Sequence, residues 1–114
     1  MALLFLRRDV AASLTNSALD LAGYTGETVW YEPHGGSYSS VTVMLSSVVT
    51  AGQLTVDVRK DGIKVTPNVV LAAGESRESV TLSVGVVAGS QLSVVVTTTS
   101  TWAPTTNTVL VLLE

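Results

Sequence analysis

The stretch QLTVDVRKDGIKV, residues 53–65, decides the fold of this chain. Apolar and polar residues alternate through residues 54–59, and a period of two places them on opposite faces of a β-strand. The following pair, Asp61 and Gly62, predicts a two-residue hairpin turn, because both turn positions need a positive φ. The sequence therefore predicts two antiparallel strands joined by a tight turn.

Similar alternation runs through the second half of the chain, residues 41–114. Glycine turns interrupt it about every eight to twelve residues, which is typical of an antiparallel sandwich or barrel. We expect an all-β fold: a single antiparallel β-sandwich, jelly-roll-like, with about eight strands and little helix. The expected strands are residues 29–32, 41–45, 53–60, 63–65, 69–72, 78–84, 91–98 and 108–113.

A chain of 114 residues predicts one domain, which we divide into two parts. Residues 28–114 are expected to form the sandwich, and residues 1–27 a short N-terminal arm or docking segment. Residues 13–22 fit a helical face or a strand, and their Thr, Asn and Ser favour extended structure. Residues 34–40 are predicted to form a Gly/Ser loop.

Several partners and compartments are disfavoured by the composition. Six basic against nine acidic residues give a net charge of −3, without the basic stripe that nucleic-acid binding requires. The apolar run at residues 2–6 precedes its charges and is too short for a secretory signal, and no run approaches the ~20 apolar residues of a membrane span. We therefore expect no nucleic-acid or membrane partner, and synthesis in the cytoplasm.

No motif predicts catalysis. Cysteine is absent, which excludes disulfides, thiolate metal sites and cysteine nucleophiles. The single histidine, His34, lies in a Pro/Gly/Ser stretch, and the nine carboxylates are scattered without the close spacing of a calcium loop. Serine-hydrolase, phosphate-loop and zinc-helix motifs are also absent. We expect no enzyme activity, no metal and no cofactor.

Two features predict self-association. Charged residues make up 13% of the chain, against about 25% in ordinary globular proteins. The last two predicted strands also carry apolar residues on both faces, which indicates burial on both sides. In a two-layer domain, a neighbouring chain or an added arm must cover the second face. Val95, Leu110 and Leu112 are therefore predicted to lie in an oligomer interface.

The aromatic residues have two interpretations. Trp30, Tyr31 and Tyr38 lie around a glycine loop, and Trp102 lies in a second loop. Exposed rings beside polar loops can stack on the apolar faces of sugars. Alternatively, the tryptophans fill the ends of the sandwich with their polar ring atoms hydrogen-bonded near the surface.

Residues 52–114 resemble the jelly-roll-like β-sandwich modules of tailed-phage virion proteins, which include capsid decoration proteins, head fibres and receptor-binding tips. The resemblance rests on the hairpin at residues 61–62, the Ala-Gly turns at residues 73–74 and 88–89, and the strands that follow them. After the second of these turns such modules usually carry Asp, whereas this chain has Ser90. The resemblance implies trimers and assembly onto a virion.

Two functions follow from the residues and the resemblance together. In the first, the protein is a structural component of the virion, a capsid decoration (cement) protein that binds the head surface as a homotrimer. Its partners are then itself and other virion proteins such as the major capsid protein, and it assembles in the host cytoplasm. The residues expected to dock on the capsid are Leu3, Leu4, Phe5, Leu6, Arg7 and Arg8.

In the second function, the protein is a receptor-binding module of a tail or fibre that recognises host-surface glycan. Its contacts are then expected from Trp30, Tyr31, Tyr38 and Trp102. A third class, a secreted adhesin or pilus subunit, is disfavoured by the lack of a predicted secretion signal.

Overall fold

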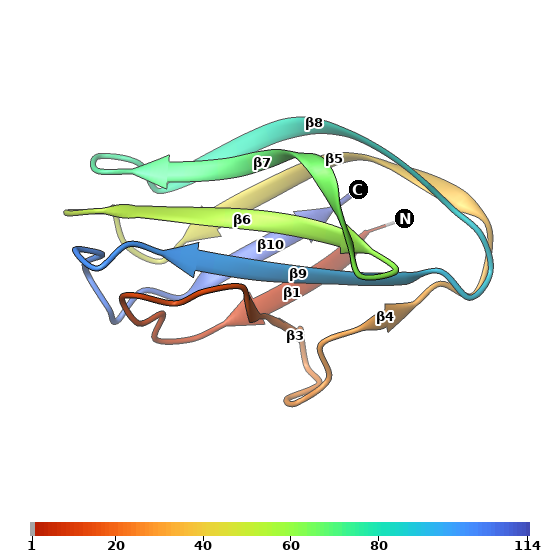
Figure 1. The fold of residues 1–114 in the computed structure, drawn as a ribbon, viewed down its shortest axis with the longest axis horizontal. Coiled ribbons are helices and arrows are strands. Elements are labelled where there is room, and N and C mark those ends of the chain that lie inside the picture. Colours follow the sequence, from red (N-terminus) through yellow and green to blue (C-terminus); the bar gives the residue numbers. More distant parts are fainter. Residues whose placement is uncertain (1) are drawn as a thin grey trace.

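The computed structural model describes residues 2–114, apart from the side chains of residues 66 and 67, and shows two antiparallel sheets packed face to face (Figure 1). The strands are β1 (Leu3–Arg7), β2 (Ser17–Ala18), β3 (Asp20–Leu21), β4 (Trp30–Tyr31), β5 (Gly36–Leu45), β6 (Gln53–Lys60), β7 (Ile63–Ala72), β8 (Arg77–Val86), β9 (Gln91–Thr98) and β10 (Val109–Leu113). We call the sheet with the order β3-β1-β10-β5-β8 sheet A. Sheet B has the order β2-β9-β6-β7, and β4 also pairs with β9.

Consecutive strands alternate between the two sheets, except where β6 and β7 form a hairpin. The expected single antiparallel sandwich is therefore confirmed. No helix in the described part of the chain is long and apolar enough to cross a membrane.

The hairpin predicted from residues 53–65 is present. Asp61 and Gly62 have φ angles of 53° and 80°, as this turn requires. The turn is also fixed to β9: the Asp61 amide donates to the Gln91 carbonyl oxygen at 2.7 Å, and the Gln91 amide donates to Asp61 Oδ1 at 2.9 Å. Beyond the turn, residues 63–65 and 69–72 belong to one strand, β7, rather than two.

The N-terminal segment is not a separate arm. β1 lies inside sheet A, paired with β10 over its whole length and with β3 on its other side. The side chains of Leu3 and Phe5 lie in the core, and Phe5 is 0% exposed. The domain boundary expected at residue 27 is therefore wrong over the described residues, because β1 shares its period-two pattern with β10 and completes the same buried face. Residue 1 lies outside the described residues.

The segment from residue 34 to 40, expected as a loop, becomes a strand after two residues. β5 begins at Gly36 and pairs with β8, and Tyr38 is buried between the sheets. Pairing and burial outweigh the low strand propensity of Gly and Ser here. β4 is correspondingly shorter than the strand expected at residues 29–32.

The core lies between the sheets and is built from alternate residues of the long strands. Its fully buried members include Val41, Val43, Leu54, Leu71, Leu92, Val94, Val109 and Val111. The residues between them point outward, so the character of those outward residues decides what each sheet offers to a partner.

Candidate functional site

Four leucines on the outer side of sheet A form what we call the leucine face. Leu4 stands opposite Leu112, and Leu6 stands opposite Leu110, on the paired strands β1 and β10. All four alternate with core residues along their strands and are half-buried. Leucines directly opposite each other on neighbouring strands contact one another, so the four make one continuous apolar surface at the centre of the sheet.

Met44 of β5 extends this surface, since it pairs with Leu110 on the other side of β10. A hollow of about 260 Å³ lies beside it, lined by Leu6, Met44, Leu45, Ser46, Thr108 and Leu110. Polar residues border the surface: Asp20 stands opposite Leu6, and Arg77 Nη2 donates to Met44 Sδ at 3.3 Å. An apolar centre within a polar border is the usual composition of a protein-protein interface.

The three residues predicted for the oligomer interface lie on two different sheets. Leu110 and Leu112 lie in the leucine face, as described. Val95 lies on the outer side of sheet B, yet it is only 8% exposed within one chain. Ala18 of β2 and Asp57 of β6 flank it in register, so its burial is already reached within one chain, next to its own N-terminal segment and β6. The prediction that a partner chain covers Val95 is therefore corrected.

The six predicted docking residues also lie in different environments: the core, the leucine face and the end of β1. Leu3 and Phe5 are core residues, so their side chains cannot contact a capsid without unfolding of β1, and this part of the prediction is corrected. Leu4 and Leu6 belong to the leucine face. Their neighbours Arg7 and Arg8 follow at the end of the strand: Arg7 Nη1 donates to the Ala18 carbonyl oxygen at 3.2 Å, and Arg8 is exposed.

The predicted aromatic residues do not form one site. Trp30 pairs with Leu92 at the start of β9, whereas the Trp102 amide bonds to the Thr99 carbonyl oxygen just past its end, so the two tryptophans lie at opposite ends of the sandwich. Trp102 is buried, and its Nε1 donates to the Val10 carbonyl oxygen at 2.9 Å. Trp102 thus has the end-filling role given above as the alternative to sugar binding.

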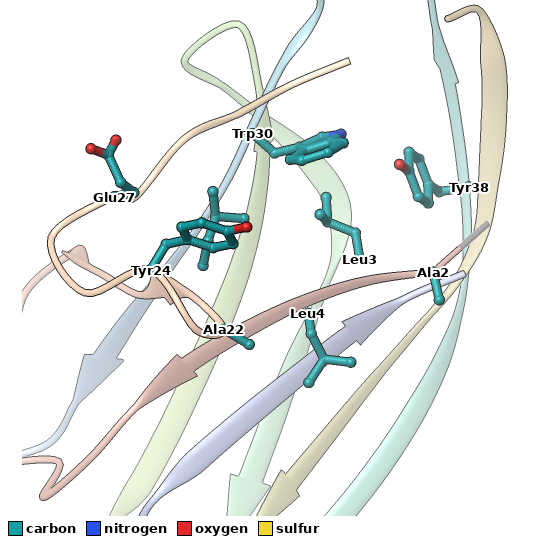
Figure 2. A pocket seen from close by; sticks show the side chains of 9 residues that line it. Ala2, Leu3, Leu4, Ala22, Tyr24, Glu27, Trp30 and Tyr38 are labelled. Atoms are coloured by element: carbon teal, nitrogen blue, oxygen red, sulfur yellow. The ribbon is translucent and has the colours of Figure 1, made fainter. Parts of the chain in front are cut away.

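Trp30 and Tyr38 do line a common pocket of about 360 Å³, shown in Figure 2. Leu3, Leu4, Leu21, Ala22, Tyr24 and Glu27 are among its other walls. Tyr31 is not among them and is 62% exposed. Tyr24 and Glu27 were not predicted, because the glycines at residues 23 and 26 give their segment the pattern of an ordinary loop.

A buried carboxylate ties the two predicted rings together. Glu32 Oε2 accepts hydrogen bonds from Trp30 Nε1 at 3.1 Å and from the Tyr38 hydroxyl at 2.9 Å. Burial, together with the hydrogen bond to Glu32 and the charge of Glu32, raises the pKa of Tyr38 to about 12. Glu32 Oε1 is buried without a hydrogen-bond partner among the described residues. The polar atoms of both rings are therefore engaged with Glu32.

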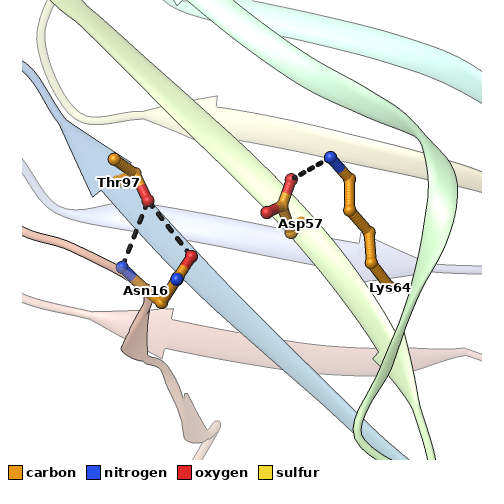
Figure 3. A network of polar contacts seen from close by, with 4 residues as sticks. All are labelled: Asn16, Asp57, Lys64 and Thr97. Carbon is orange, nitrogen blue, oxygen red and sulfur yellow. Dashed lines mark hydrogen bonds and ion pairs between the residues drawn. The ribbon is translucent and has the colours of Figure 1, made fainter.

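The outer side of sheet B carries polar contacts instead of an apolar surface (Figure 3). Lys64 Nζ lies 3.8 Å from Asp57 Oδ1 across the hairpin, and Asn16 bonds through its amide to Thr97 Oγ1 at 3.1 Å. Within the described residues there is no group of three His, Cys, Asp or Glu side chains that could hold a metal ion.

No protein-family model and no curated protein matches this sequence. Among solved structures, the globular domain of zebrafish complement 1qA protein is similar, with a TM-score of 0.59 and 8% identity over 99% of this chain and 94% of that chain. PRD1 vertex protein P5 is similar with a TM-score of 0.51 and 14% identity over 99% of this chain and 95% of that chain. The fold is jelly-roll-like. At these identities the likeness concerns the fold alone.

Proposed function

We propose that this protein is a non-enzymatic structural component of a phage virion, a capsid decoration protein that binds the head surface as a homotrimer. The observation that carries the proposal is the leucine face, an apolar surface at the centre of sheet A whose four leucines remain partly exposed. The resemblance of residues 52–114 to phage virion modules supports it. So does the fold shared with PRD1 vertex protein P5, which its name places at a virion vertex.

The energetics indicate how large the interface must be. Burying a fully exposed leucine contributes about 1.5–3 kcal/mol, so each half-buried leucine of the face contributes about 1 kcal/mol. Association costs about 4–15 kcal/mol in lost freedom of motion. The four leucines therefore do not hold an oligomer alone. We expect the interface to include Met44 and the polar border as well, and to reach the roughly 800 Å² per partner of a standard interface.

Sedimentation of the purified protein tests self-association. We expect a species of three times the chain mass, and we expect Leu110→Glu to convert it to monomer, because a carboxylate would be buried at the centre of the face. Ile63→Glu is the matched control: Ile63 is 73% exposed at the hairpin turn, away from the leucine face. A monomeric wild type, or a trimer that persists in Leu110→Glu, would overturn the proposal.

Binding to the head is a separate measurement. Wild-type protein mixed with undecorated capsids should co-sediment with them in many copies per head. Removing residues 1–9 is unsuitable as a test because it removes β1, so Arg8→Glu is used, since Arg8 is exposed at the end of that strand. We expect weaker capsid binding by this variant with the trimer intact. If the protein forms trimers that do not bind heads, the self-association is supported and the decoration role is refuted.

The alternative, a tail or fibre module that binds host glycan, retains only Trp30 and Tyr38 of its four aromatic residues at one site. Sugar recognition needs polar groups directed at the hydroxyls, and here both ring donors are engaged by Glu32. A screen against host polysaccharide decides between the functions. Saturable binding that is lost in Trp30→Ala would favour the alternative.

A further inference from the structure

The pocket beneath Trp30 is a gap at the edge of sheet A. β3 pairs with β1 only at Phe5 and Leu6, and the last backbone bond between the segments runs from the Ala22 amide to the Leu4 carbonyl oxygen at 3.0 Å. Beyond it the chain leaves β1 and returns as β4 in the other sheet. Figure 2 shows the resulting space between β1 and the segment that carries Tyr24 and Trp30.

The segment that forms the outer wall is held in place by its own backbone. The Tyr24 amide donates to the Leu21 carbonyl oxygen at 2.9 Å, and the Glu27 amide donates to the Tyr24 carbonyl oxygen at 3.1 Å. The Leu21 amide donates in turn to the Glu27 carbonyl oxygen at 2.7 Å. Tyr24 is 68% exposed although its backbone is fixed, so its ring is available to a ligand at little cost in ordering.

The walls present mostly ring faces and alkyl groups, together with the Tyr24 hydroxyl and the Glu27 carboxylate. Trp30 Nε1 and the Tyr38 hydroxyl both donate to Glu32 and are not free to bind a ligand. Donation to a carboxylate also polarises each ring, which increases the negative charge of its π face. Such a surface discriminates poorly among neutral polar ligands and attracts positive charge.

Among the described residues, the charged side chains at the pocket and behind its rings are acidic. Glu27 is the one charged residue among the described residues that line it, and it stands on the outer rim with its carboxylate turned outward (Figure 2). Glu32 lies behind the rings, within hydrogen-bonding distance of both. Arg7 and Arg8 line a separate hollow together with Asp20. An anion entering the pocket would therefore be repelled, and a cation attracted.

We propose that this pocket binds a small organic cation of the alkylammonium type, held against the faces of Trp30 and Tyr24 with its alkyl part on Leu3 and Ala22. The proposal requires neither the trimer nor the capsid, although Leu4 belongs to the leucine face as well as to the lining of this pocket. A compact trimethylammonium group suits the apolar walls because it offers no hydrogen-bond donors that the pocket would leave unpaired.

Titration with choline, followed by NMR of the two indole N–H groups, tests the proposal. We expect the Trp30 indole resonance to shift saturably, while the resonance of Trp102, buried at the other end of the sandwich, does not move. The neutral carbon analogue dimethylbutanol has the same shape without the charge, and we expect it to bind roughly tenfold more weakly. Equal binding of the two compounds, or no saturable shift with choline, would overturn the proposal.

Variants locate the site. Tyr24→Ala should reduce choline affinity by roughly tenfold, and because Tyr24 is exposed this variant is expected to fold. Glu27→Gln should reduce the affinity about twofold, as expected for a rim carboxylate screened by water. Tyr31→Ala, an exposed ring outside the pocket, is the control and should leave the affinity unchanged. Choline binding that survives Tyr24→Ala unchanged would show that the cation binds elsewhere.

Discussion

Replacing Tyr38 with Phe should abolish a specific loss of stability at alkaline pH. The Tyr38 ring is buried between the sheets, and its hydroxyl donates to Glu32 Oε2 at 2.9 Å. Burial above all, and then the hydrogen bond to Glu32 and its negative charge, raises the pKa of Tyr38 from 10.0 to about 12 in the folded protein. In the unfolded chain the phenol returns to its ordinary pKa.

The sign of the effect follows from the protons that each state binds. Below pH 10 the phenol is protonated in both states, so the stability contributed by this group is fully present. Between about pH 10 and 12 the unfolded chain loses the proton while the folded protein keeps it, so the free energy of unfolding falls as the pH rises. A difference of two pKa units corresponds to about 2.7 kcal/mol, a large part of the 5–15 kcal/mol that stabilises a typical domain.

Urea unfolding followed by circular dichroism, repeated from about pH 8 to about pH 12, measures the effect. Tyr38→Phe should be less stable than wild type at the lower pH by about 1.5–3 kcal/mol, because Glu32 loses a hydrogen bond to its charged oxygen. The difference in unfolding free energy between the two proteins should narrow as the pH rises. The other titrating groups are present in both proteins, so their effects cancel in this difference. Tyr31→Phe, in an exposed ring, should stay parallel to wild type. Parallel curves for Tyr38→Phe and wild type across the range would refute the reasoning.

Five further substitutions test the packing in three comparisons. Gly52→Ala should lower the free energy of unfolding in urea by more than about 2 kcal/mol, because Gly52 has a φ of 72° and an added Cβ would lie 2.7 Å from the Trp102 amide nitrogen. Gly74→Ala is the control. Gly74 has a φ of 91° and no neighbour within 4 Å of an added Cβ, so this variant should lose only about 1–2 kcal/mol, from the backbone alone. Trp102→Phe should cost about 1–3 kcal/mol by calorimetry, because the buried loop carbonyl that the indole N–H bonds at 2.9 Å loses its donor. Phe5→Ala should lower the free energy of unfolding by about 3–5 kcal/mol, and Leu6→Ala should lower it much less in the monomer, because Phe5 lies in the core and Leu6 on the outer face. Equal losses of stability in thermal unfolding would contradict the placement of β1.

Local patterns predicted the parts of the fold whose partners are close in sequence. The hairpin at Asp61 and Gly62 follows from turn chemistry and from the alternation on both sides, so nothing distant is needed to specify it. β1 could not be assigned in the same way. Five residues with an apolar pattern fit an arm as well as a strand, and the choice depends on pairing with residues 109–113, which no local signal reports.

The candidate sites show the same limit. Leu110 was predicted to lie in an oligomer interface because its strand stops alternating, and the structure places it half-buried on the outer side of sheet A. Val95 breaks the alternation of its strand too, but it is already buried within one chain, where β2 and β6 pair with β9 on either side of it. Trp30 and Tyr38, which lie close together in the sequence, line one pocket. Tyr24 also lines it, because three backbone bonds within residues 21–27 fix its segment and the Ala22 amide bonds to the Leu4 carbonyl oxygen of β1, an effect of geometry rather than of composition.

The pairing of β1 with β10 has a consequence for synthesis on the ribosome. β1 cannot pair with β10 until residues 109–113 have emerged from the ribosome. Leu3 and Phe5 therefore remain exposed while most of the chain is translated. Contacts of such wide sequence separation slow folding, and the waiting apolar segment is open to pairing with other nascent chains. If three chains do assemble on these same strands, neighbouring ribosomes on one message would supply the partners at the moment each sheet closes, and closure and assembly would then become a single kinetic event.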